Sequence, residues 1–349
     1  MSEENNKMKS KVRQSNMELL RIVAILLVVV THTDYYAIGE PTSEFCKNEM
    51  LKASFQYFIE SFSIVCVNCF IFISGWFSIK PTVKGFANLL FQLVFYNLLV
   101  YFCFLAFGII QFDLEGFVRH FNILYFWFIR CYIALYLISP ILNKFIEHSS
   151  KELSGRIVII FAALDVVLGW GLDCLQFDGG YSLLHFMVIY LIARYIHVHG
   201  VRLLSYDKKW DLSIYLLISI ATPVLIIVSY YLLPAVWHHS GRLFLYNSPF
   251  VMVASVCLCL FFAKLKFQSR VVNFVGASAF AVFLIHGDAL ISENLLPEFC
   301  SKMFHNYDVF SFSAIITVSI IILFLVSIFV DQIRKWLWGK IQILLRTKD

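Results

Sequence analysis

Two basic side chains in one apolar segment are the first candidates for chemistry. Arg21 and His32 both lie in ELLRIVAILLVVVTH, a run with few other polar residues. Eleven residues separate them, close to three helical turns, so they share a helix face and lie about 16 Å apart along its axis. That face offers a guanidinium near one end and an imidazole, a natural general base, in the other half. The alternative is an arginine reaching lipid head groups and a histidine at the opposite interface.

Further polar residues interrupt other apolar segments. His286 ends the run NFVGASAFAVFLIH at a depth similar to that of His32, so the two histidines could line one cavity. Glu60 could orient one of the histidines, or could be a solvated residue at the membrane interface. Asp165 has no obvious partner in the sequence. Such residues are costly inside a membrane, which makes them functional candidates.

Several cations are candidates for holding an anionic ligand. Arg130, in WFIRCYIALYLISP, is expected in the middle of a span, where it must face a cavity or a partner. Arg194, Lys80 and Lys84 lie nearer the predicted cytoplasmic side and could form a basic mouth with Arg21. The alternative for Arg194, Lys80 and Lys84 is that they only set the membrane topology.

Transmembrane helices must position these side chains. The chain has 349 residues, of which 60% are hydrophobic and 15% charged, whereas soluble domains carry about 25% charged residues. The apolar blocks of about 20 residues match the thickness of a bilayer, and helices satisfy their own backbone polar groups there. Aromatic residues make up 17% of the chain and are typical of membrane proteins. The pattern predicts an all-α bundle of about ten spans, at 17–37, 54–76, 85–110, 121–142, 156–174, 182–199, 212–234, 246–264, 271–292 and 311–333.

Loop charges give the bundle its orientation. With a cytoplasmic N-terminus, 20 of the 28 Lys and Arg residues fall in inside segments and five fall outside, as the positive-inside rule requires. We therefore expect both ends in the cytoplasm, with an N-terminal tail at 1–16, one membrane domain at 17–335 and a C-terminal tail at 336–349. No cleavable signal peptide is evident.

Other function classes lack their signatures. The chain has no Walker A loop, no GxGxxG after a strand, no GxSxG and no HExxH motif. The positive charges form no basic face, so no nucleic-acid partner is expected. Cys66 and Cys69 are read as small core residues, and no metal site is expected. Phosphate recognition would have to come from Arg and Lys side chains and helix ends.

These residues together resemble the acyltransferase 3 family of bacterial integral membrane acyltransferases. The resemblance covers roughly residues 15–335. Its strongest part is the family's arginine, ten residues and then a histidine, matched by Arg21 and His32, with Glu18 at the acidic position. The other parts are VNCFIFISGWF, which contains Asn68, Ser74 and Gly75, then WFIRCYIALYLISP, GYSLLHFMVIYLIARYI and the FLIH motif ending at His286.

The resemblance implies an activity. The protein would be a multi-pass enzyme of the bacterial inner membrane that takes an acetyl or similar short acyl group from cytoplasmic acetyl-CoA or another acyl-CoA. The acceptor would be a hydroxyl of an envelope polysaccharide or its lipid-linked precursor. The basic mouth would hold the CoA phosphates, and His32 would activate the hydroxyl or carry the acyl group. No permanently bound cofactor is expected, and a homo-oligomer is one arrangement compatible with this role.

Two features depart from the family pattern. The family often has Arg-x-x-Arg in the loop after its Ser-Gly segment, whereas this loop reads SIKPTVKGF, with Lys80 and Lys84. Lysine lacks the bidentate fork of arginine. Some members also carry a soluble domain that completes the transfer, and none is expected here.

Two other readings remain open. A transporter or flippase for a polysaccharide intermediate or a small metabolite would suit ten spans and a charged residue inside the membrane. The missing internal repeat speaks against it. A membrane sensor that has kept the fold is the third reading.

Overall fold

The computed structural model describes residues 13–121 and 126–346, and every regular element within these ranges is a helix. The expected N-terminal tail therefore lies largely outside the described residues. The α-helices are α1 (Ser15–Thr31), α2 (Ser43–Asn48), α3 (Met50–Ser63), α4 (Cys66–Phe77), α5 (Val83–Ala106), α6 (Leu114–His120), α7 (Trp127–His148), α8 (Lys151–Leu164), α9 (Leu183–His199), α10 (Lys208–Leu232), α11 (Pro234–Trp237), α12 (Pro249–Ala263), α13 (Arg270–Gly276), α14 (Ala279–His286), α15 (Leu296–Asn306) and α16 (Val309–Arg346).

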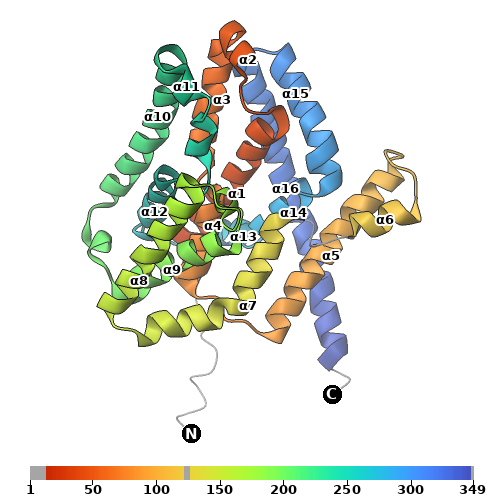
Figure 1. The fold of residues 1–349 in the computed structure, drawn as a ribbon. Coiled ribbons are helices and arrows are strands. Elements are labelled where there is room, and N and C mark those ends of the chain that lie inside the picture. Colours follow the sequence, from red (N-terminus) through yellow and green to blue (C-terminus); the bar gives the residue numbers. More distant parts are fainter. Residues whose placement is uncertain (1–12, 122–125, 347–349) are drawn as a thin grey trace.

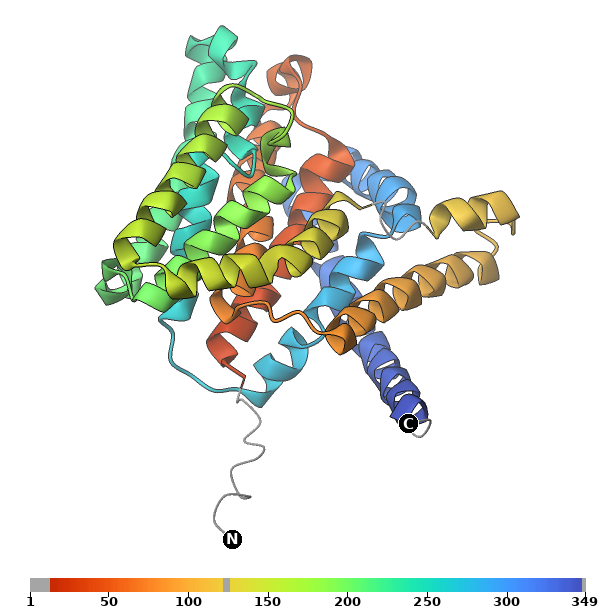
Figure 2. The same cartoon turned by 60° about the horizontal axis from the view of Figure 1, so that its bottom comes forward.

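The predicted multi-pass helical bundle is confirmed. In the described part of the chain, eight helical segments are long and apolar enough to cross a membrane, and a bent pair makes a ninth. The remaining expected span, 182–199, coincides with α9, an apolar helix of 17 residues. The first turn of α1 and the last turn of α16 lie on the same side of the bundle (Figure 1, Figure 2), as an even number of crossings requires.

The expected ninth span is broken. Arg270–His286 and Ile291–Asn306 meet at a bend of 66°, and the break falls at Gly287 and Asp288. The carboxylate of Asp288 accepts a hydrogen bond from the backbone N–H of Leu290 (3.1 Å), which starts a new helical segment. As a result α15 occupies the stretch that was expected as an exterior loop at 293–310.

Two other boundaries differ from expectation. Helix α7 begins at Trp127 rather than near 121, because the short helix α6, capped by the side chain of Asp113, precedes it. Helix α16 continues to Arg346, so the described part of the expected C-terminal tail extends the last span.

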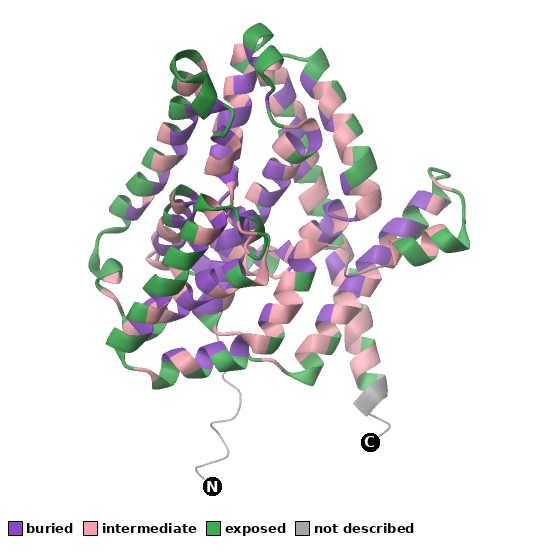
Figure 3. Cartoon of the chain, in the orientation of Figure 1, coloured by how far each residue is buried: buried purple, intermediate pink, exposed green. Residues whose placement is uncertain are grey.

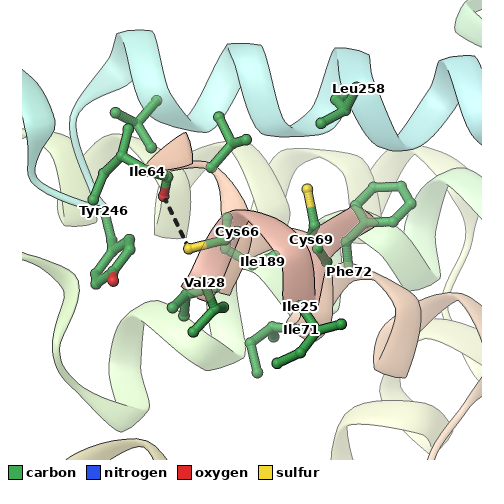
Figure 4. Packing of buried hydrophobic residues seen from close by; sticks show 14 of the residues in the cluster. Ile25, Val28, Ile64, Cys66, Cys69, Ile71, Phe72, Ile189, Tyr246 and Leu258 are labelled. Atoms are coloured by element: carbon green, nitrogen blue, oxygen red, sulfur yellow. Dashed lines mark hydrogen bonds between the residues drawn. The ribbon is translucent and has the colours of Figure 1, made fainter. Parts of the chain in front are cut away.

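The core lies where α1, α4 and α9 meet. Figure 3 shows buried residues along the inner faces of the helices and exposed residues on the outer faces. In Figure 4, Cys66 and Cys69 point into apolar packing that includes Val28 and Phe72. These thiols are therefore small core side chains, as the sequence predicts.

A glycine permits a close helix contact in this core. A Cβ atom added to Gly75 would lie 2.6 Å from the backbone oxygen of Tyr190 and 2.8 Å from the Cβ of Ala193. Helices α4 and α9 can approach so closely because position 75 has no side chain. Interfaces between membrane helices commonly rely on small residues in this way.

The outer end of α1 widens into a π-helical turn, His32–Tyr36. Such turns occur often at functional sites, because they change the direction of successive side chains within a helix. His32 is the first residue of this turn, and the side chains that follow it are aimed differently from those of a continuous α-helix.

Candidate active site

A cavity of about 810 Å³ follows α1 through the bundle. Its lining includes Arg13 and Arg21 near the first turn of α1, His32 farther along, and Tyr36 and Glu40 at the opposite end, which we call the outer end. Small-molecule sites commonly occupy roughly 300–1,000 Å³. The cavity is therefore large enough for a substrate and joins the two ends of the predicted Arg21–His32 face.

The structure brings His32 and His286 together. Their ring centroids are 5.1 Å apart, with 57° between the ring planes. His32 lines the cavity, whereas His286 lies behind it, between the lining residues Phe283 and Gly287. The two histidines come from α1 and from the end of α14, where the span breaks.

The hydrogen bond of His286 fixes which of its nitrogens carries the proton. Its Nδ1 donates to the backbone oxygen of Val282 (2.5 Å), so Nε2 holds the lone pair. His286 Nε2 and His32 Nδ1 are both buried with no hydrogen-bond partner. The two nitrogens form no hydrogen bond with each other in the structure, and the rings would have to reorient to bring them to roughly 3 Å for a hydrogen bond. Such a bond would leave the Nε2 lone pair of His32 for chemistry.

Glu60 shares the cavity with His32. Only 3% of Glu60 is exposed, and its Oε2 atom is buried without a hydrogen-bond partner. The expected contact from Glu60 to a histidine is therefore not formed through this oxygen. Asp34 is also buried, and both of its carboxylate oxygens lack partners. The outer half thus contains acidic groups that no basic side chain in the described ranges neutralises.

The end of the cavity beside the first turns of α1 has the opposite charge. Arg21 Nη1 lies 2.6 Å from Glu18 Oε2, and Arg13 Nη1 lies 3.3 Å from Glu18 Oε1. Two guanidinium groups share one carboxylate, which leaves one net positive charge beside the cavity. Arg13, which the sequence pattern places in the N-terminal tail, thus joins Arg21 at the site.

The other predicted cations lie away from the lining. Arg194 is buried and pairs with Glu147 at 2.6 Å. Lys80 and Lys84 are exposed, although Lys80 directly follows the lining residue Ile79. The expectation for Arg130 is wrong: this residue is exposed on the first turn of α7 rather than mid-span against a cavity, because α7 begins late.

A buried polar network was missed because its members are distant in sequence. Asp165 Oδ2 lies 2.7 Å from His185 Nδ1, and His185 Nε2 lies 2.7 Å from Asn68 Oδ1. Asn68 Nδ2 donates to the backbone oxygen of Tyr246 (3.0 Å). Each of these residues interrupts an apolar run, and this was the available signal. The network holds the backbone of Tyr246, whose ring lines the cavity.

The outer rim contains one carboxyl group outside the spans. Burial raises the pKa of Glu40 above its ordinary value. Its carboxylate lies over Gly241, where an added Cβ atom would be 2.9 Å from both carboxylate oxygens. The missing side chain at position 241 allows Glu40 to reach the cavity, which both residues line.

Metal binding gains no support from the structure. In the ranges that the model describes, no group of three or more His, Cys, Asp or Glu side chains is arranged to hold a metal ion.

Comparison with known protein families gives a match over most of the chain. The family model of an acyltransferase domain matches residues 14–337. No curated protein and no solved structure matches the chain.

Proposed function

The chain belongs to the family that this acyltransferase domain defines, and on that premise we propose that it transfers a short acyl group, such as acetyl, from cytoplasmic acyl-CoA to a hydroxyl of an envelope glycan. That it is a membrane acyltransferase follows from the family and from its apolar helices. The observation that carries the finer proposal is one cavity lined by Arg21 and His32 at different depths.

The donor enters from the cytoplasm in this proposal. Arg13 and Arg21 would bind phosphate groups of CoA, since guanidinium groups make strong charge-assisted hydrogen bonds to phosphate. The pantetheine arm would extend along α1 and bring the thioester to His32. The single carboxylate of Glu18 supports this arrangement, because it holds both guanidinium groups in position and still leaves one net positive charge.

His32 acts as the general base. Its Nε2 takes the proton from the acceptor hydroxyl while the hydroxyl oxygen attacks the thioester carbonyl. The carbon–sulfur bond then breaks, and the departing CoA thiolate takes the proton from His32. His286 is a positioning residue: by accepting a hydrogen bond from His32 Nδ1 it would keep Nε2 unprotonated between turnovers.

Removal of the imidazole tests this mechanism. His32→Ala should lower the transfer of radiolabelled acetyl from acetyl-CoA into the envelope glycan fraction by roughly 10²- to 10⁴-fold, the usual contribution of a general base. His148→Ala, which changes an exposed residue at the end of α7, is the matched control. Wild-type transfer by folded, membrane-inserted His32→Ala protein would refute the assignment.

Donor binding separates this proposal from a transporter. Purified protein should bind acetyl-CoA, and Arg21→Ala should weaken this binding about tenfold, through the loss of a charged hydrogen bond. Arg156→Ala, at an exposed arginine of α8, should leave binding unchanged. A folded protein with no affinity for acetyl-CoA would favour the transporter reading.

A further inference from the structure

Three aromatic rings form a continuous wall on the outer part of the cavity. The ring centroids of Trp127 and Tyr181 are 4.6 Å apart, those of Tyr181 and Tyr246 are 4.8 Å apart, and those of Trp127 and Tyr246 are 5.8 Å apart. All three residues line the cavity. Tyr181 is 40% exposed and is one of the lining residues. We call these three residues the aromatic wall.

The position of the aromatic wall is fixed from behind. Gly180 has a φ of +96°, and a Cβ atom there would lie 2.7 Å from the Cβ of Tyr246 and 2.9 Å from the backbone nitrogen of Asn247. The loop before α9 can therefore pack directly on the backbone before α12. Together with the hydrogen bond from Asn68 to Tyr246, this packing holds the rings in place before any ligand arrives.

A buried carboxylate faces the same space as the aromatic wall. Glu60 lines the cavity, is 3% exposed, and interacts electrostatically with the phenol groups of Tyr181 and Tyr246. Its Oε2 atom has no hydrogen-bond partner. An ionised carboxylate is costly to bury without a positive partner, so a cationic ligand would favour the ionised form of Glu60 and would itself be held by it.

Among the described residues, the Arg and Lys side chains near the cavity do not supply a positive charge beside Glu60. Of the described residues that line the cavity, the Arg and Lys members are Arg13 and Arg21, at the opposite end. Arg242, near the outer rim, is engaged elsewhere: it pairs with Asp173 at 3.4 Å and donates to the backbone oxygen of Trp170. Glu40 adds a second carboxylate to the outer lining.

Aromatic faces attract cations, and they do so more strongly away from water. We propose that the aromatic wall and Glu60 form a subsite for an organic ammonium group, so that the acceptor is a hydroxyl compound that also carries a protonated amine, such as an amino sugar. This inference rests on the proposed function, and it narrows the acceptor class. A neutral sugar stacking on the same rings would not use the charge of Glu60.

Two sugars that differ in one group test the proposal. Full-length protein in nanodiscs is titrated with glucosamine and with glucose at about pH 6, where a sugar amine is protonated. Binding is followed by tryptophan fluorescence and by thermal shift. Glucosamine should bind roughly tenfold more tightly than glucose. Equal binding of the two sugars, or binding of neither, would overturn the proposal.

Variants of Glu60 and Tyr181 test whether these residues cause the preference for glucosamine over glucose. Glu60→Gln should abolish the preference for glucosamine, whereas Glu44→Gln, at an exposed carboxylate of α2, should retain it. Tyr181→Leu should weaken glucosamine binding, whereas Tyr181→Phe, which keeps the aromatic ring, should bind glucosamine as the wild type does. Retention of the full preference by Glu60→Gln would refute the role of the carboxylate.

Acetyl-CoA binding in the same preparation distinguishes failure of the ammonium subsite from failure of the acyltransferase proposal. If acetyl-CoA binds and glucosamine behaves like glucose, the ammonium subsite is wrong and the acyltransferase proposal stands. If acetyl-CoA fails to bind to folded protein, the proposed function itself is wrong.

Discussion

The contact between His32 and His286 allows a sharp test of how the base is positioned. His286→Phe removes both ring nitrogens and keeps an aromatic ring of similar size between Val282 and His32. The change therefore deletes the lone pair on Nε2 that His32 Nδ1 would donate to, with little loss of packing. We expect the variant to fold and to bind acetyl-CoA as the wild type does.

The magnitude follows from the one hydrogen bond that the mechanism proposes between the two rings, because the bond from His286 Nδ1 to the backbone oxygen of Val282 does not involve His32. One net hydrogen bond is worth about 0.5–1.5 kcal/mol, and 1.4 kcal/mol corresponds to about tenfold in rate. His286→Phe should therefore slow acyl transfer by about 2- to 13-fold, far less than His32→Ala. Because His286 acts through His32, adding His286→Phe to His32→Ala should cause almost no further loss.

The assay is the transfer of radiolabelled acetyl into the envelope glycan fraction by membranes with matched amounts of each variant. Two results would refute the reasoning. If the double variant is slower than His32→Ala by the full factor of His286→Phe, the two histidines act independently. If His286→Phe alone is as slow as His32→Ala, His286 takes part in the chemistry directly.

Three further predictions concern packing and charge. Gly75→Ala should destabilise the protein by about 1–3 kcal/mol, because the new Cβ atom would lie 2.6 Å from the Tyr190 backbone oxygen; an unchanged melting temperature would contradict this. Gly276→Ala places a Cβ atom 2.6 Å from Glu18 Oε2, so it should raise the KM for acyl-CoA more than it lowers kcat, and a pure kcat effect would argue against donor binding at that end. Burial raises the pKa of Glu40 above 4.5, so the folded state holds this proton more tightly and stability should fall as pH rises from about that value through the raised pKa. Glu40→Gln should flatten the pH dependence of the melting temperature in this window, and an unchanged slope would count against it.

Features that depend on one segment could be predicted from the sequence. The spacing of Arg21 and His32 places both on one face of a single helix, and both line one cavity. Hydrophobicity and loop charge likewise predict the spans, because bilayer thickness and backbone hydrogen bonding leave few alternatives.

Features that depend on where two segments meet could not be predicted in this way. The partner of Asp165 is His185, 20 residues away across a change of helix. Arg130 appears central in its apolar run, yet α7 starts only three residues before it. In each case the outcome depends on tertiary packing, which periodicity in one segment does not record.

The aromatic wall shows the same limit. Aromatic residues are frequent throughout the chain, so their number gave no reason to choose Trp127, Tyr181 and Tyr246. Their common position results from α7, the loop closed by Gly180 and the segment before α12. The available clue was the pair of glycines directly before Tyr181, because glycine readily adopts the positive φ that a tight turn requires.

The π-helical turn at His32–Tyr36 has a consequence for how this protein could diverge. Such a turn holds one more residue than an α-helical turn, so deleting one residue after His32 would convert it to an α-helix and leave α1 and His32 unchanged. Residues beyond the turn would keep their register, whereas the side chains of the turn itself, which include the lining residues Tyr35 and Tyr36, would be re-aimed relative to the cavity. A change of one residue in chain length could therefore alter which side chains line the outer part of the cavity, while Arg21 and His32 keep their positions.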